Sequence, residues 1–110
     1  MKDDIVYIEH ILESISKIQE YSHGFTKEQF AKNDMAVDAV IRNIEIIGEA
    51  SKKVSGNLKQ VYFEIPWKEM AGMRDKLIHD YMGVDTEVIW QTIIEDLPPL
   101  KEQLGKIPIK

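Results

Sequence analysis

The chain has 110 residues and no cysteine, which fits a single domain over residues 1–110 and excludes disulfides and thiolate metal sites. Its start, Met-Lys-Asp-Asp, lacks the apolar stretch of a signal peptide, and no apolar run approaches the ~20 residues of a membrane span, so we expect a cytoplasmic protein without membrane contact. The net charge of −5 argues against a general nucleic-acid binder, whose surface is usually basic, but allows an enzyme with a local basic cleft.

The first predicted element is an amphipathic helix over residues 4–21. Its apolar residues recur at spacings of three and four, which is the period of one helix face; they are Ile5, Ile8, Leu12, Ile15 and Ile18. Residues 22–24, which end in Gly24, break this pattern. Thr26 and Gln29 then have the spacing of a capping box, which predicts a short second helix.

A long helix is predicted over residues 34–55, with Asn33 or Asp34 as its N-cap. It is apolar over most of its circumference, so it should be central or pack on two neighbours, one of which could be a second subunit. A narrow polar stripe remains, formed by Asp38, Arg42, Glu45, Glu49 and Lys53. The stripe is either a solvated face held by pairs at i,i+4, or it places Arg42 and Glu45 in a cleft or a dimer seam.

The second half of the chain continues the helical pattern. A connector over residues 57–65 should pack through Val61, Tyr62 and Phe63. Pro66 suits the first turn of a helix that runs to about residue 81, and Gly83 suits its end. A final helix, capped by Asp85 or Thr86 and interrupted near Pro98 and Pro99, should direct five side chains inward: Ile89, Ile93, Leu97, Leu100 and Leu104. The tail from Gly105 is expected to fray.

The most informative segment is Arg74 to Tyr81, with the spacing Arg-x4-His-x-Tyr. Cleavage of RNA without a metal needs a base for the 2′-hydroxyl, an acid for the leaving 5′-oxygen and a cation for the phosphate. His79 titrates near neutral pH and can serve as acid or base. Arg74 stays charged and can bind a phosphate through two donors. The alternative is a purely structural role, in which these residues only cap a helix end, where cations interact favourably with the helix dipole.

Helix geometry alone does not bring the three side chains together. Arg74 and Tyr81 are seven residues apart and share a helix face, whereas His79 points about 140° away from Arg74. Either the helix ends near Gly83 and frees His79, or two copies of the chain assemble the site. We favour the dimer, because it supplies two histidines and two arginines.

Other candidate residues have simpler explanations. His10 and His23 lack partners at metal-ligand spacing and are predicted to be surface residues, so we expect neither a metal site nor a cofactor. Trp67 and Trp90 could stack on bases, but anchors in the core or an interface are the more usual role.

The chain resembles the HepT-type toxins of the HEPN superfamily, which are small helical ribonucleases paired with minimal nucleotidyltransferases. Arg74, His79 and Tyr81 match the family's RX4HXY motif. Residues 41–50 resemble its second-helix signature, and residues 66–67 and 84–98 also match in order and spacing. Asp75 departs from the asparagine that the family more often has, and an ionised aspartate cannot donate a hydrogen bond.

The resemblance implies an all-α bundle of four to five helices that forms a homodimer. Arg74 and His79 of both subunits would cut RNA without a metal, with Asp75 in a supporting role. Tyr81 would be the position at which the cognate nucleotidyltransferase antitoxin adds AMP and silences the toxin. A bulky anionic adduct beside Arg74 would block a phosphate site by size and charge.

Two other functions remain open from the sequence. The chain could be a non-catalytic helical subunit that docks a nucleotidyltransferase, which the acidic charge and Asp75 suit well. It could also be a nucleotide-binding domain that uses Arg74 for phosphate.

Overall fold

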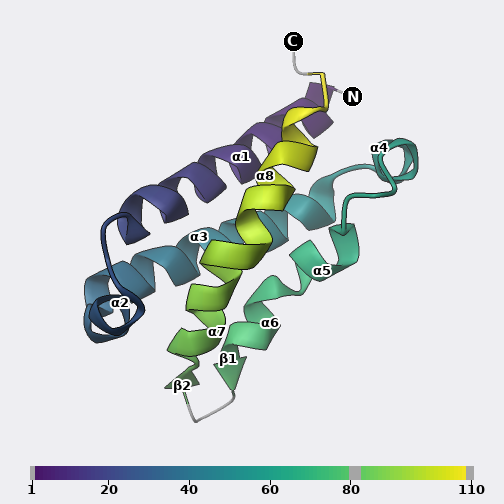
Figure 1. The fold of residues 1–110 in the computed structure, drawn as a ribbon. Coiled ribbons are helices and arrows are strands. Elements are labelled where there is room, and N and C mark those ends of the chain that lie inside the picture. The colour runs from purple at the N-terminus through teal and green to yellow at the C-terminus, as the bar shows by residue number, and fades with distance from the viewer. Residues whose placement is uncertain (1, 80–82, 109–110) are drawn as a thin grey trace.

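The computed structural model describes the backbone of residues 2–79 and 83–108 and the side chains of residues 3–77 and 83–108. Two long helices, α1 (Lys2–Ser22) and α3 (Asp34–Lys53), lie side by side and run in opposite directions. The C-terminal helical segment, residues 86–105, crosses in front of this pair (Figure 1). The expected all-α fold is confirmed, apart from one pair of two-residue strands.

The first half of the chain follows the predicted pattern closely. Thr26 and Gln29 form the expected capping box at the start of α2 (Lys27–Lys32). The N-cap of α3 is Asn33, whose side chain accepts a hydrogen bond from the Ala36 N–H at 3.0 Å. The inward face of α1 differs slightly from the prediction, because Ile11 is fully buried whereas Ile5 and Leu12 are only partly buried.

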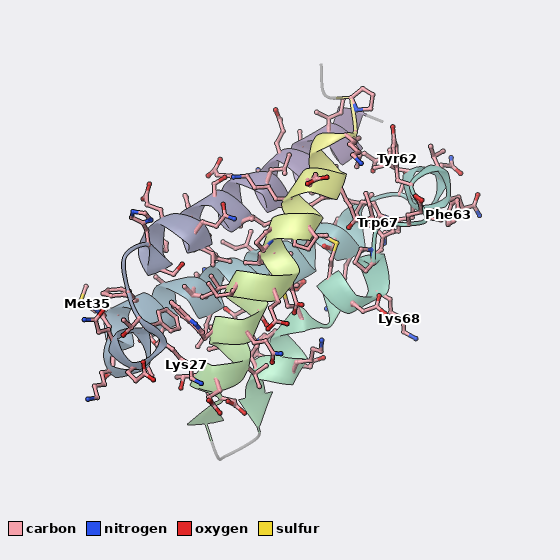
Figure 2. The ribbon with its side chains drawn as sticks, viewed as in Figure 1. Lys27, Met35, Tyr62, Phe63, Trp67 and Lys68 are labelled. Carbon is pink, nitrogen blue, oxygen red and sulfur yellow. The ribbon has the colours of Figure 1, made fainter. Side chains whose placement is uncertain are left out.

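The segment predicted as a connector contains a further helix, α4 (Gly56–Val61), which is capped by the Ser55 hydroxyl. The expectation that this segment packs through three apolar side chains is wrong for two of them. Val61 is 69% exposed and Phe63 is 77% exposed, and Figure 2 shows Phe63 pointing away from the bundle. Tyr62 is partly buried, and its carbonyl accepts a hydrogen bond from the Trp67 indole N–H at 3.1 Å.

A buried carboxylate joins the start of α1 to the residues that follow α3. Asp4 on α1 accepts hydrogen bonds from the Ser55 N–H at 2.8 Å and from the Ser55 hydroxyl at 2.7 Å. The hydrogen bond from the Ser55 hydroxyl lowers the pKa of Asp4, although burial opposes this shift. Asp4 therefore holds the start of α4 against α1 in its ionised form.

Asp4→Asn is expected to lower the free energy of unfolding at neutral pH by about 1–3 kcal/mol, because it weakens a buried, charge-assisted pair of hydrogen bonds. A carboxyl with a lowered folded pKa stabilises above its ordinary pKa of 3.8, and that contribution is lost as the pH falls through the folded pKa. Urea unfolding at neutral pH and at about pH 3 should therefore show the difference between variant and wild type shrinking in acid. Asp3→Asn, at the exposed neighbouring position, is the control. Equal stability of Asp4→Asn and wild type at neutral pH would contradict the expectation.

The predicted helix over residues 66–81 is interrupted twice. It consists of α5 (Trp67–Ala71) and α6 (Met73–Leu77), separated at Gly72, since glycine inside a helix is unfavourable. The chain then forms β1 (Ile78–His79), which pairs antiparallel with β2 (Gly83–Val84). Helical structure thus ends before His79, earlier than predicted. Gly83 lies in β2 at a φ of 86° rather than at the end of a helix.

The last helical segment starts as predicted at Asp85, whose carboxylate accepts hydrogen bonds from two N–H groups of α7 (Thr86–Gln91). It continues through a π-helical turn, η2 (Thr92–Asp96), into α8 (Leu97–Gly105). This wider turn stands where the sequence predicts an interruption, directly before the two prolines, which cannot donate N–H groups to the preceding turn. All five predicted inward side chains are buried: Ile89, Ile93, Leu97, Leu100 and Leu104.

The core includes a residue close to the C-terminus that was expected to lie in a frayed tail. Ile107 is 5% exposed and belongs to the core, so the prediction of fraying from Gly105 is wrong up to that residue. Within residues 2–79 and 83–108, no helix is both long enough and apolar enough to cross a membrane.

Candidate active site

The structure distributes the motif residues over a helix and a strand. Arg74 and Asp75 lie on α6 and are exposed. The backbone of His79 lies in β1, paired with Gly83, while its side chain is outside the described part of the chain. Tyr81 also lies outside the described residues. The helix-to-strand change between Arg74 and His79 removes the argument that helix geometry must hold them 140° apart.

Arg74 opens onto a hollow of about 400 Å³ between α3 and the α5–α6 segment. The floor of the hollow is formed where α3 passes α5 at Gly48. A Cβ atom at Gly48 would stand 3.2 Å from the Ala71 carbonyl oxygen, so only glycine permits this approach without movement of the neighbouring backbone. Eight residues line the hollow: Arg42, Glu45, Gly48, Glu49, Lys52, Ala71, Arg74 and Asp75.

An ion pair between α3 and α6 holds the Arg74 side chain. The Arg74 Nε donates a hydrogen bond to Glu45 Oε2 at 2.7 Å. The other oxygen of Glu45, Oε1, lies 3.9 Å from a terminal nitrogen of Arg42. The Arg74 side chain is 49% exposed, so Glu45 restrains its Nε edge while leaving the guanidinium accessible to a ligand.

The polar stripe on α3 is largely exposed, as expected for a solvated face, but it lacks the two ion pairs that were expected to hold it. Among the described residues, neither Asp38 with Arg42 nor Glu49 with Lys53 forms the i,i+4 ion pair that such a face would favour. Arg42 and Glu45 instead contribute to the same hollow as Arg74. Arg74, which bonds to Glu45 in this hollow, is 29 residues from Glu45 in sequence, so the period of the helix does not reveal their contact.

The hollow combines cations and carboxylates in equal number. Arg42, Lys52 and Arg74 contribute positive charge, whereas Glu45, Glu49 and Asp75 contribute negative charge. Phosphate binding there would rest on the placement of individual cations rather than on a generally basic surface. Lys52 is absent from the sequence-based candidates, although its position seven residues after Glu45 could have placed it on the same helix face.

The two other histidines and the two tryptophans lie where the sequence analysis expects them. His10 and His23 are exposed, as expected for surface residues. Trp67 is buried, and the partly buried Trp90 ring packs on Phe30 with centroids 5.4 Å apart, so both serve as anchors in the core. Within the described residues, no group of three His, Asp or Glu side chains is arranged to hold a metal ion.

Comparison with known proteins places the chain in a family. The family model described as "Ribonuclease HepT-like" matches residues 11–107. The "Probable ribonuclease HepT" of Thermococcus cleftensis is 48% identical over 92% of this chain and 92% of its own length. The "Putative RNase TTE0752" of Caldanaerobacter subterraneus is 42% identical over 97% of this chain and 96% of its own length.

A third relative contains a similar sequence within a longer protein. The "Gamma-glutamylcyclotransferase and putative RNase MJ0434" of Methanocaldococcus jannaschii is 48% identical over 96% of this chain, which spans only 48% of that protein. No solved structure matches the chain. The match over nearly the whole chain, together with two relatives of similar length, shows that this chain belongs to the HepT-like ribonuclease family.

Proposed function

We propose that this chain is a metal-independent endoribonuclease and the toxin of a toxin–antitoxin pair. The observation that carries the proposal is the accessible Arg74 guanidinium, held by Glu45 in a hollow and followed five residues later by His79 at the start of a β-hairpin. Membership of the HepT-like ribonuclease family supports RNA as the substrate.

The proposed reaction is attack of the 2′-hydroxyl oxygen on the adjacent phosphorus. The hydroxyl proton passes to a histidine base, the bond from phosphorus to the 5′-oxygen breaks, and a histidine acid protonates that oxygen. Arg74 offsets the negative charge that accumulates on the phosphoryl oxygens in the transition state. The products are a 2′,3′-cyclic phosphate and a 5′-hydroxyl end.

A homodimer would complete this site. Each motif supplies one histidine, whereas the reaction uses an acid and a base at the same time. Two copies that face each other through the hollow beside Arg74 would supply both groups and two arginines. His79 is the last residue of β1, and β1 directly follows α6 (Figure 1), so its backbone lies outside the helix that carries Arg74, which suits such an arrangement.

The test is cleavage of RNA by the chain expressed without a partner, in excess EDTA. The proposal predicts cleavage with 2′,3′-cyclic phosphate ends, which are resistant to ligation until the cyclic phosphate is opened. The mass of the protein should be measured first, so that an adduct on Tyr81 cannot explain inactivity. An unmodified chain that leaves RNA intact would reject the ribonuclease proposal.

A second candidate is a non-catalytic helical subunit that docks a nucleotidyltransferase or binds nucleotide through Arg74. The balance of carboxylates and cations around Arg74 favours this alternative. The two candidates differ in cells, because only the toxin predicts that expression of this chain alone stops growth. Saturable ATP binding without RNA cleavage would favour the alternative.

Glu45 is expected to position Arg74 for cleavage. Glu45→Ala should reduce kcat by about 10–100-fold, because a guanidinium without its partner samples several rotamers and a small misplacement is costly in catalysis. Glu45→Gln should retain part of the activity, since its amide oxygen can still accept from Nε. Asp38→Ala, which removes an exposed carboxylate of the same helix outside the hollow, is the matched control and should stay near wild type. Single-turnover kinetics would contradict this role if the Glu45→Ala and Asp38→Ala rates were equal.

A further inference from the structure

A second hollow adjoins the one beside Arg74, on the outer side of the α1–α3 pair. It has a volume of about 270 Å³ and shares Arg42, Glu45 and Glu49 with the first. The two hollows therefore meet at these three side chains of α3, one on the side of Arg74 and the other on the side of α1. The residues found only in the second hollow are Tyr7, His10, Ile46, Ala50 and Lys53.

The second hollow differs from the first in having an aromatic and apolar lining. The Tyr7 ring is partly buried against the core, so its position is restrained while part of it stays accessible. The Lys53 ammonium lies 5.9 Å from the centroid of this ring, within the range of a cation–π contact. Ile46 and Ala50 add apolar surface from α3, and the exposed His10 adds a second ring on α1.

These features suit one nucleotide of a single strand. Aromatic rings bind bases by stacking, and cations beside them bind the backbone, a combination typical of single-stranded nucleic-acid sites. The hollow is slightly smaller than the about 300–1,000 Å³ of drug-sized ligand sites, which fits one base better than a larger ligand. A strand whose phosphate lies at Arg74 could continue past Arg42 into it, since Arg42 lines both hollows.

We propose that the second hollow is a subsite for the nucleotide next to the cleaved phosphate, in which the base displaces the Lys53 ammonium from the Tyr7 ring and stacks there, while Lys53 binds the following phosphate. This subsite rests on the proposed ribonuclease function and deepens it, because it assigns a place to the strand beyond the reacting atoms. Glu45 and Glu49 also line the second hollow, so binding of the strand there rests on the individual placement of Arg42 and Lys53 rather than on a generally basic surface.

The experiment uses the wild-type chain and a fluorescent 2′-O-methyl oligoribonucleotide of about six nucleotides, a length within the usual range of single-strand sites. The methyl group removes the attacking hydroxyl, so fluorescence anisotropy measures binding without cleavage. Tyr7→Ala and Lys53→Ala should each weaken binding by about tenfold, the size of a lost stacking contact. Tyr7→Phe should bind like wild type, because it keeps the ring.

Matched controls come from the same elements. Tyr21→Ala removes the other tyrosine of α1, which is 37% exposed and lies near the opposite end of the helix. Lys17→Ala removes an exposed lysine of α1 that pairs with Glu13 at 3.2 Å. Both should leave the affinity unchanged, which would exclude a general effect of aromatic or cationic residues.

The outcomes separate the subsite from the proposed function. Wild-type binding that Tyr7→Ala and Lys53→Ala leave intact would overturn the subsite, whatever the cleavage result. Wild-type binding that both variants weaken, from a chain that does not cleave ordinary RNA, would support the subsite and reject the ribonuclease. Unchanged affinity with loss of dimer in sedimentation of Tyr7→Ala would show that this face contacts a second copy of the chain, and would also overturn the subsite.

Discussion

His79→Ala and Arg74→Ala are each expected to reduce RNA cleavage by about 10²–10⁴-fold, the usual contribution of a general acid or base and of a charge that stabilises the transition state. The two substitutions should affect different kinetic parameters. His79→Ala should lower kcat with little change in KM, because proton transfer occurs only in the transition state. Arg74→Ala should also weaken binding of the uncleavable oligoribonucleotide, because its cation contacts phosphate in the bound state.

Arg74→Lys separates charge from geometry. Lysine keeps the positive charge but offers no planar pair of donors, and it cannot reproduce the Nε contact with Glu45. We therefore expect Arg74→Lys to recover only a small part of the lost rate.

The chain offers matched controls for both positions. His23→Ala removes an exposed histidine in the turn after α1, and Lys76→Ala removes an exposed cation two residues from Arg74 on the same helix. Both should cleave at the wild-type rate. Cleavage by His79→Ala or Arg74→Ala at the rate of these controls would remove the motif from the mechanism.

Co-expression with the cognate nucleotidyltransferase is expected to silence the wild-type chain but not Tyr81→Phe. In the proposed modification the tyrosine hydroxyl oxygen forms a bond to the α-phosphorus of ATP, pyrophosphate leaves, and the hydroxyl proton is released. Phenylalanine lacks this oxygen and cannot be modified. The proposed adduct adds a negative charge and a nucleoside to the motif, and both would oppose binding of a substrate phosphate at Arg74.

Two measurements follow this silencing. Cells that express the nucleotidyltransferase with the wild-type chain should grow, whereas cells with Tyr81→Phe should stop growing. Peptide mass spectrometry should find AMP on the peptide that contains Tyr81. Tyr62→Phe is the control, because its partly buried ring packs on the core far along the chain from the motif, and it should be silenced like wild type. An unshifted Tyr81 peptide in silenced cells would exclude AMP modification at this position.

Local sequence patterns were sufficient for most of the helical structure. The long helices and the final helical segment were predicted from apolar residues that recur every three to four positions. All five predicted inward residues of the final segment are buried. The caps at Thr26, Asn33 and Asp85 follow from side chains that bond to N–H groups within three residues. These features depend on contacts between near neighbours, which sequence spacing describes directly.

The errors occur where more distant contacts compete with local preference. The helix over residues 66–81 is periodic, but the structure ends it at Leu77, whose carbonyl accepts a hydrogen bond from the Asp85 N–H at 2.9 Å. Phe63 is apolar but exposed, whereas Ile107 in the predicted loose tail is buried. Whether an apolar side chain finds a partner depends on elements elsewhere in the chain.

The sequence by itself determined the helical class, the family and the residues that carry the candidate chemistry, because the Arg-x4-His-x-Tyr spacing and the helix periods are local properties. Only the tertiary structure decided that Glu45 holds Arg74 and that helical structure ends before His79. It also decided that Tyr7 lines a hollow next to the one beside Arg74. The physical reason is that packing of α1, α3 and α6 brings together side chains far apart in sequence, and no local preference encodes which of them meet.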